Sequence, residues 1–218
     1  MSDKINYTKA IINLATGSYV KGQDRLRDSL KNVGYQGDFL GWTAEHQIGA
    51  PPHADNPYAF KIHGFREAER QGHRFILWLD ASVWAIKDVK PIFDHIEKHG
   101  YICQEAGHLV GNWVNQNCLD YFKITREEAM KMVMYGNAGF LGLDLWDTRA
   151  NAFLHSWEKS MLAGAFKGSH SDHRHDMSAG SIIANKLNMT YQKGGEWLAY
   201  ASPEDEVNDT IILKAQGL

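Results

Sequence analysis

Residues 74–82 read RFILWLDAS and carry the clearest structural signal in the chain. The apolar run over residues 74–79 predicts a short strand buried on both faces, as in a parallel sheet. A carboxylate directly after such a strand is unfavourable unless it has a partner. Because ligands of open α/β sheets bind outside the carboxyl ends of the strands, Asp80, Ala81 and Ser82 are candidates for a binding site. The alternative is that Asp80 caps the next turn through its side chain.

A second apolar run, AIINLATG at residues 10–17, predicts another buried strand that ends in a turn of small residues. Ala15, Thr16 and Gly17 would let a ligand approach the backbone, and Tyr19 could stack on a base. The segment contains neither the dinucleotide fingerprint Gly-x-Gly-x-x-Gly nor a phosphate-binding P-loop. An ordinary strand-to-helix turn is the alternative interpretation.

Strands and helices are predicted to alternate along the chain. Hydrophobic spacing and stop residues predict helices over residues 23–32, 58–70, 88–98, 125–134, 148–163 and 176–187. Further strands are predicted over residues 38–43, 101–104, 137–145 and 210–213, with a proline-rich loop over 47–57. Thr125 and Glu128 have the spacing of a capping box. The alternation predicts an α/β fold, a single domain over residues 1–218 with a mixed, mostly parallel central sheet flanked by helices.

The composition is that of an ordinary globular protein, with 44% hydrophobic and 22% charged residues among 218. The net charge of −3 argues against a general attraction to nucleic acid or to an anionic membrane. The N-terminus lacks the apolar segment of a signal peptide, and no apolar run approaches the length of a membrane span. We therefore expect a cytoplasmic protein in which Cys103 and Cys118 are reduced thiols.

Two further segments carry chemistry-bearing or unusual residues. The densest polar cluster is SHSDHRHDMS at residues 169–178, just before a predicted helix. Three interpretations of this cluster are open. It could be a metal site, a catalytic loop with a carboxylate at a helix N-terminus, or an exposed loop in which Asp176 only caps the helix. The stretch YGNAGFLG at residues 135–142 contains three glycines, which indicate a close backbone approach beside a ligand or a bulged core strand.

In their order and spacing, these segments resemble the GT-A glycosyltransferases over residues 11–189. In that family a strand and a small-residue turn hold the nucleotide, and an Asp-x-Asp motif follows a later strand. Asp80-Ala81-Ser82 resembles this motif with Ser82 in place of the second acid. His175-Asp176-Met177-Ser178 resembles the His-Asp-Glu-Ser stretch that opens a late helix, with Met177 in place of the glutamate.

The resemblance implies transfer of a hexosyl or pentosyl group from a nucleoside diphosphate sugar, with UDP as the nucleotide, to a hydroxyl of a glycan or a modified nucleobase. It implies Asp176 and Arg174 as catalytic residues, with Lys61 and Arg174 against the departing diphosphate. Mn²⁺ or Mg²⁺ would be held by Asp80 together with His173 and His175. The implied donor-binding residues are Ala15, Thr16, Gly17, Tyr19, Lys61, Asp80, Ala81, Ser82, Asn137, Ala138 and Gly139.

Two other functions fit parts of the pattern. A nucleotidyltransferase also places an acidic motif after a strand, but it normally needs two carboxylates for its metal ions, and residues 80–82 supply one. An inactive sugar-nucleotide-binding module would explain Ser82 and Met177, the two departures from the family's motifs. Binding without turnover would distinguish such a module from an enzyme.

Overall fold

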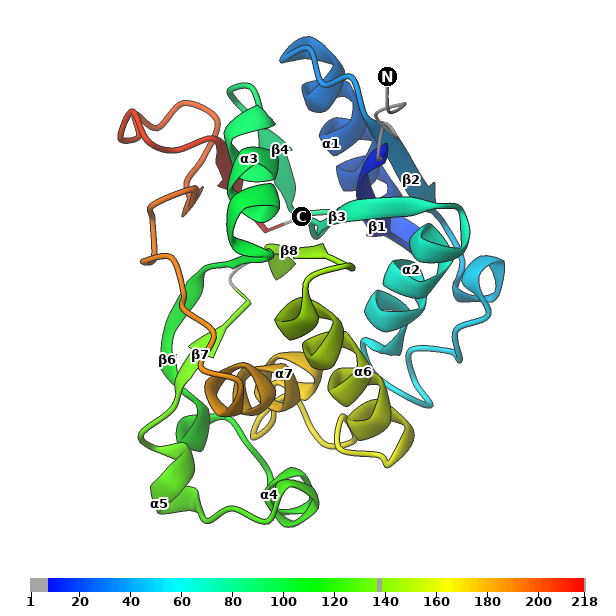
Figure 1. Ribbon diagram of the computed structural model, residues 1–218. Helices are drawn as coiled ribbons and strands as arrows, with labels where there is room; N and C mark the ends of the chain where they lie inside the picture. Colours follow the sequence, from blue (N-terminus) through cyan, green and yellow to red (C-terminus); the bar gives the residue numbers. More distant parts are fainter. Residues whose placement is uncertain (1–7, 137–138, 218) are drawn as a thin grey trace, which may run out of the picture.

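Five strands form the central sheet within residues 8–136 and 139–217, which the computed structural model describes (Figure 1). In spatial order the strands are β2 (Asp38–Trp42), β1 (Thr8–Leu14), β3 (His73–Trp78), β8 (Leu141–Asp144) and β5 (Tyr101–Cys103). β1 runs parallel to β2 and β3, whereas β8 is antiparallel to both of its neighbours. β5 therefore has the direction of β3, which confirms the predicted mixed, mostly parallel sheet.

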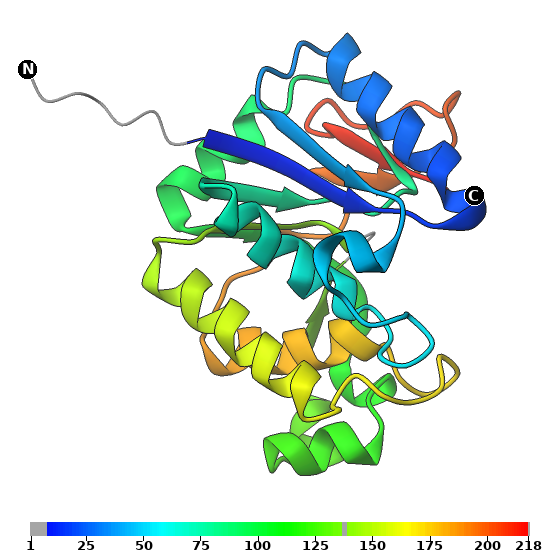
Figure 2. The ribbon, with the colours of Figure 1, turned by 90° about the vertical axis from the view of Figure 1, so that its right-hand side faces the viewer.

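Helices cover both faces of the sheet, as Figure 2 shows. The helices described are α1 (Val20–Asn32), α2 (Ala59–Arg70), α3 (Lys90–His99), α4 (Gln116–Phe122), α5 (Arg126–Ala129), α6 (Thr148–Leu162) and α7 (His175–Lys186), with the 3₁₀ turns η1 (Gly17–Tyr19), η2 (Glu45–Ile48) and η3 (Val110–Asn112). α1 and α3 pack on one face, and α2 and α6 pack on the other. None of the helices in residues 8–136 and 139–217 is both long and apolar enough to cross a bilayer.

Alternate residues of β3 point into the two cores, which explains its unbroken apolar run. Phe75 and Leu77 pack with α1 and α3, whereas Ile76 and Trp78 pack with α2 and α6. Each of these four side chains is buried. A strand with helices on both faces has no solvent-facing side, so it needs no polar alternation.

Apart from the last strand of the chain, the short strands outside the central sheet were missing from the sequence-based prediction. β4 (Val83–Ala85), β10 (Leu213–Ala215) and β9 (Leu198–Tyr200) form one sheet, and β6 (Glu105–Leu109) pairs with β7 (Val133–Tyr135). Most of these strands contain three residues, too few to show a hydrophobic period. The last strand lies at residues 213–215 rather than 210–213, and the strand predicted at 137–145 begins at Leu141.

The predicted helix over residues 125–134 is too long. The Thr125 hydroxyl accepts a hydrogen bond from the Glu128 N–H, and the Glu128 carboxylate accepts one from the Thr125 N–H, so the capping box is confirmed. The helix ends at Ala129, however, and β7 begins at Val133. Pairing with β6 and packing against α7 outweigh the helical spacing of this segment.

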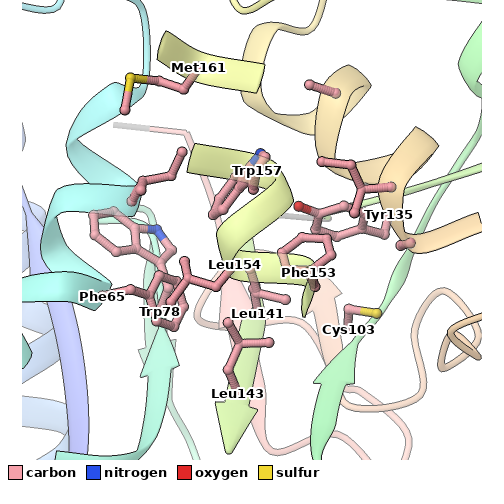
Figure 3. Packing of buried hydrophobic residues seen from close by; sticks show 14 of the residues in the cluster. Phe65, Trp78, Cys103, Tyr135, Leu141, Leu143, Phe153, Leu154, Trp157 and Met161 are labelled. Atoms are coloured by element: carbon pink, nitrogen blue, oxygen red, sulfur yellow. The ribbon is translucent and has the colours of Figure 1, made fainter. Parts of the chain in front are cut away.

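A large core lies between the sheet and the helices α2, α6 and α7 (Figure 3). Phe65 from α2, Trp78 from β3, and Phe153 and Trp157 from α6 meet there, each no more than 1% exposed. The indole N–H of Trp157 donates to the backbone oxygen of Asp176 at 3.0 Å. This core therefore anchors the first turn of α7 as well as closing one face of the sheet.

The two cysteines are buried and free, as predicted for reduced thiols. Burial raises the pKa of the Cys103 thiol well above its usual range and that of Cys118 to about 12. Neither thiol is activated as a nucleophile, because reactivity requires the thiolate.

Candidate active site

A cavity of about 360 Å³ opens at the carboxyl ends of β1 and β3. It is lined by Leu14, Ala15, Thr16, Tyr19, Glu45, His53, Tyr58, Phe60, Asp80, Ala81 and Ser82. The turns after the two strands meet here because β1 and β3 are parallel neighbours, with Ile12 opposite Trp78. The two turns that the sequence predicted as parts of a binding site, one after each of these strands, thus line one cavity. Gly17, the first residue of η1, comes directly after Thr16 but does not line the cavity.

A buried asparagine fixes the two turns relative to one another. The Asn13 amide donates to the backbone oxygen of Leu79 at 2.6 Å, and its side-chain oxygen accepts from Gln23 Nε2 at 2.9 Å. Asn13 is 0% exposed. It lies at the end of β1, and its partner Leu79 lies directly before Asp80. The bridge was not predicted, because it joins residues far apart in the sequence.

Replacing Asn13 with alanine is expected to lower the free energy of unfolding by about 1–3 kcal/mol, since two buried partners lose their hydrogen bonds. Urea denaturation measures this difference. Thr8→Ala is the matched control, because the Thr8 hydroxyl makes an exposed 3.3 Å hydrogen bond to Gly72 at the other end of β1. An equal decrease in the free energy of unfolding in the two variants would show that the buried Asn13 bridge stabilises the fold no more than an exposed hydrogen bond does.

Three charged residues from separate elements meet beside the cavity, and we call them the Lys61 cluster. Lys61 Nζ lies 3.3 Å from Asp80 Oδ1 and 3.1 Å from Asp176 Oδ2. Lys61 comes from the first turn of α2, Asp80 follows β3, and Asp176 belongs to the first turn of α7. Trp78 Nε1 also donates to Asp80 Oδ1, at 2.8 Å. Lys61 and Asp176 are each 4% exposed, whereas the Asp80 side chain is 34% exposed and reaches the cavity.

The cluster keeps Lys61 charged. Burial by itself would lower the pKa of the Lys61 ammonium, but the charges of Asp176 and Asp80 outweigh burial and raise it. Burial raises the pKa of the Asp176 carboxyl, and Lys61 only partly opposes this effect. The ammonium thus remains positive across the physiological range, while Asp176 takes up a proton more readily than an exposed aspartate does.

A second, much smaller space of about 10 Å³ lies behind Asp80. It is lined by Lys61, Trp78, Tyr135, Gly136, Gly139, Leu141, Trp157, Asp176 and Met177. Gly139 has a φ of +67°, and a Cβ added there would collide with the Asp80 carboxylate. The backbone at this glycine therefore lies close to the Asp80 side chain, while its predicted approach to a ligand stays a prediction. Asn137 and Ala138, also predicted to bind donor, lie outside the described residues.

Solved glycosyltransferases share this architecture. The chain is similar to the bifunctional glycosyltransferase WbbM, with a TM-score of 0.56 and 9% identity over 99% of this chain and 46% of that one. The chain has the GT-A fold. Mouse xyloside xylosyltransferase 1 gives a TM-score of 0.52 at 9% identity, covering 96% of this chain and 97% of that one. The galactosyltransferase LgtC, solved with donor and acceptor sugar analogs, gives 0.54 at 9% identity, covering 95% and 86%.

The chain spans less than half the length of the WbbM structure. Neither a protein-family model nor a curated protein matches the sequence. The likeness to the GT-A structures is therefore one of fold, and the function must be argued from the site.

Within this GT-A fold, Arg174 does not lie where the sequence predicted it. Its guanidinium stacks on the Trp113 ring at 3.8 Å and donates to the backbone oxygen of His170. Arg174 lines neither the large nor the small cavity. The prediction that it faces the diphosphate is corrected, because an aromatic face and a carbonyl already hold it. Through this stacking contact, Trp113 helps to hold the loop that contains Arg174.

The two histidines predicted as metal ligands hold the loop before α7. His173 Nε2 bonds to the backbone oxygen of Ala165 at 2.9 Å, and its Nδ1 accepts from the Asn115 N–H at 3.4 Å. Both nitrogens of this ring are thus occupied. His175 Nδ1 bonds to the backbone oxygen of Phe166 at 2.8 Å. These contacts leave His173 without a free ring nitrogen for a metal, whereas only one nitrogen of His175 is engaged and its role as a metal ligand stays a prediction.

The described residues do not fit a divalent cation. Residues 8–136 and 139–217 contain no group of three His, Cys, Asp or Glu side chains that could hold a metal. Asp80 Oδ1 is already shared by Lys61 and Trp78. Ser82 offers a hydroxyl where a hard cation would prefer a second carboxylate.

The lowered pKa of the buried His173 ring predicts that the stability of the protein depends on pH. Burial lowers the pKa of His173 from its ordinary 6.5 to about 4. The unfolded chain therefore binds the proton more tightly, so this contribution to stability is complete above pH 6.5 and is lost as the pH falls towards 4. At pH 5 we expect His173 to lower the free energy of unfolding by about 2 kcal/mol relative to neutral pH.

Chemical denaturation of wild type and His173→Gln at pH 7 and pH 5 measures this loss. The variant lacks the titrating ring, so its stability should fall less between the two pH values. Parallel losses in both proteins would assign the acid sensitivity to other groups.

Sequence reasoning missed the aromatic wall of the large cavity. Tyr58 has a φ of +60°, and its N–H donates to His53 Nδ1 at 3.2 Å. The ring of Tyr58 lies 4.7 Å from that of His53, 5.9 Å from that of Phe60 and 5.4 Å from that of His175. The signal available in the sequence was the proline-rich loop at residues 47–57, since functional residues concentrate on such loops.

Proposed function

We propose that this chain is a glycosyltransferase that moves a hexosyl or pentosyl group from a UDP-linked sugar to a hydroxyl of a glycan or a modified nucleobase. The observation that carries the proposal is the Lys61 cluster beside a cavity at the carboxyl ends of β1 and β3. The cavity volume of about 360 Å³ is in the range of small-molecule sites. The GT-A fold supports this assignment by analogy.

The nucleotide part of the donor would occupy the large cavity. Tyr19 and Tyr58 offer ring faces for the base, and both line the cavity. The diphosphate would approach the turn after β1 and the start of α1, where backbone N–H groups and the helix dipole favour an anion. Lys61 offsets the charge of Asp80 and Asp176, which would otherwise repel the diphosphate.

Asp80 would orient the donor and Asp176 would act at the reacting sugar. Asp80 reaches the cavity, so its carboxylate can accept hydrogen bonds from sugar hydroxyls. In an inverting reaction Asp176 accepts the proton of the attacking hydroxyl, for which its raised pKa is suited. In a retaining reaction the same carboxylate stabilises the positive charge that develops on the sugar.

A binding module without turnover is the second candidate. Asp176 is 4% exposed and paired with Lys61, so substrate must reach a carboxylate that already has a partner. Met177, the next residue, has no group that can move a proton. Donor binding without release of nucleoside diphosphate would favour this candidate.

A thermal-shift screen followed by a turnover assay tests the proposal. The purified chain is heated with UDP, UDP-glucose, UDP-galactose, UDP-xylose and the corresponding guanosine and thymidine nucleotides, and stabilising donors are assayed for release of nucleoside diphosphate. We expect one donor to raise the melting temperature and to be turned over. No shift with any UDP-linked sugar would contradict the proposal.

A further inference from the structure

We propose that the Lys61 ammonium is the permanent cation of this site and takes the place of a divalent metal, so that donor binding requires no added metal ion. This role of Lys61 deepens the proposed function and rests on it. It sets the chain apart from the metal-dependent pattern that the sequence motif implies.

The position of the ammonium is the first reason. Nζ lies between two carboxylates from different elements, 3.3 Å from Asp80 and 3.1 Å from Asp176. It also lies 5.2 Å from the centre of the Tyr58 ring and 5.8 Å from that of Trp78, where aromatic faces favour a cation. A compact ammonium thus fills the space in which two acids would otherwise hold a metal.

The packing of α2 explains why Lys61 reaches this place. One turn further along the helix, a Cβ at Gly64 would lie 3.1 Å from Trp78 and 3.3 Å from Trp42. The absence of a side chain at Gly64 lets the first turns of α2 lie close against β1 and β3. Lys61 is therefore carried inward, and it is 4% exposed rather than solvated.

The ligand inventory is the second reason. Asp80 Oδ1 accepts from Trp78 Nε1 as well as facing Lys61. Ser82 replaces the second acid of the motif, and both ring nitrogens of His173 are hydrogen-bonded to the backbone. A divalent cation at Asp80 would have to displace the ammonium and would find too few hard ligands in the described part of the chain.

Titration with Mn²⁺, followed by electron paramagnetic resonance, tests this role without an activity assay. Wild type should bind Mn²⁺ weakly, and Lys61→Met should bind it at least about tenfold more tightly, because two carboxylates then lack their cation. Lys61→Arg keeps the positive charge and should behave like wild type. Lys90→Met is the matched control, since Lys90 forms an exposed pair with Asp94 on α3.

Wild type that binds Mn²⁺ as tightly as Lys61→Met would overturn the role of Lys61. If Lys61→Met does not fold, the wild-type protein still decides the question through calorimetric titration with the donor found in the screen. The affinity measured in EDTA and in Mn²⁺ should agree within about twofold. An affinity at least about tenfold higher in Mn²⁺ would overturn the role as well.

The two proposals fail in different ways. If no UDP-sugar binds in either buffer, the proposed function is contradicted, while the Mn²⁺ titrations of wild type and its variants still decide whether Lys61 replaces a metal. If a UDP-sugar binds and is turned over only with Mn²⁺, the proposed function stands and the role of Lys61 is wrong.

Discussion

Replacing Asp176 with asparagine is expected to lower kcat by about a hundredfold or more while leaving donor affinity within about fivefold. The amide has nearly the shape of the carboxylate but cannot accept the proton of an attacking hydroxyl or stabilise a cationic sugar. Asp176 lines the small space behind Asp80 rather than the large cavity, so binding of the nucleotide should change little. Steady-state kinetics and calorimetric titration with the same donor measure the two quantities.

Asp172→Asn is the matched control for this variant. Asp172 lies on the same loop but is exposed, and it lines neither cavity. Its replacement should leave kcat unchanged. Wild-type turnover in Asp176→Asn would mean that Asp176 only completes the Lys61 cluster and the first turn of α7.

Replacing Asp80 with alanine is expected to weaken donor binding by about a hundredfold, the effect of losing a strong charge-assisted hydrogen bond and the orientation of Lys61. Asp80 is the one member of the Lys61 cluster that lines the large cavity. The variant should remain folded, because Lys61 keeps Asp176 as a partner. Calorimetric titration with the donor measures the affinity, and circular dichroism confirms the fold.

Asp144→Ala controls for the loss of an ion-paired aspartate. Asp144 pairs with Arg74 at 2.7 Å, opposite Phe75 and thus at the start of β3 rather than at its end. Its replacement should reduce stability and leave donor affinity unchanged. Unchanged donor affinity in Asp80→Ala would remove Asp80 from the binding site.

The two variants are expected to separate binding from turnover. Asp80 faces the nucleotide cavity, and its loss should appear mainly in the dissociation constant. Asp176 lies deeper, beside Lys61 and the anchored end of α7, and its loss should appear mainly in kcat. Equal effects of both variants on both quantities would indicate that the Lys61 cluster acts as one structural unit.

Much of the central sheet could be predicted from local patterns. The runs at residues 10–17 and 74–79 are apolar without alternation because both faces of their strands are covered by helices. The Thr125–Glu128 capping box was readable because its hydrogen bonds join residues three positions apart. The meeting of the turns after β1 and β3 followed from the rule that parallel strands end at the same edge.

Local patterns did not predict most of the short strands or the hydrogen bonds and ring contacts of the polar residues before α7. β7 forms in a segment whose hydrophobic spacing predicted a helix. Its pairing with β6 and its contacts with α7 join residues that are distant in the sequence, so local spacing does not reveal them. The histidines at positions 173 and 175 looked like metal ligands, yet their rings bond to backbone oxygens nearby in space. Arg174 looked free for a phosphate, yet it stacks on Trp113.

The sequence by itself determined the fold class, the two strand ends that line the cavity, and Asp80 and Asp176 as the acids of interest. Only the tertiary structure decided that Lys61 lies between those acids, because an ion pair is formed by distance in space and not by spacing in the chain. The two carboxylates then decided its charge, because burial by itself would lower the pKa of the ammonium and the charges of Asp176 and Asp80 outweigh burial and keep Lys61 positive.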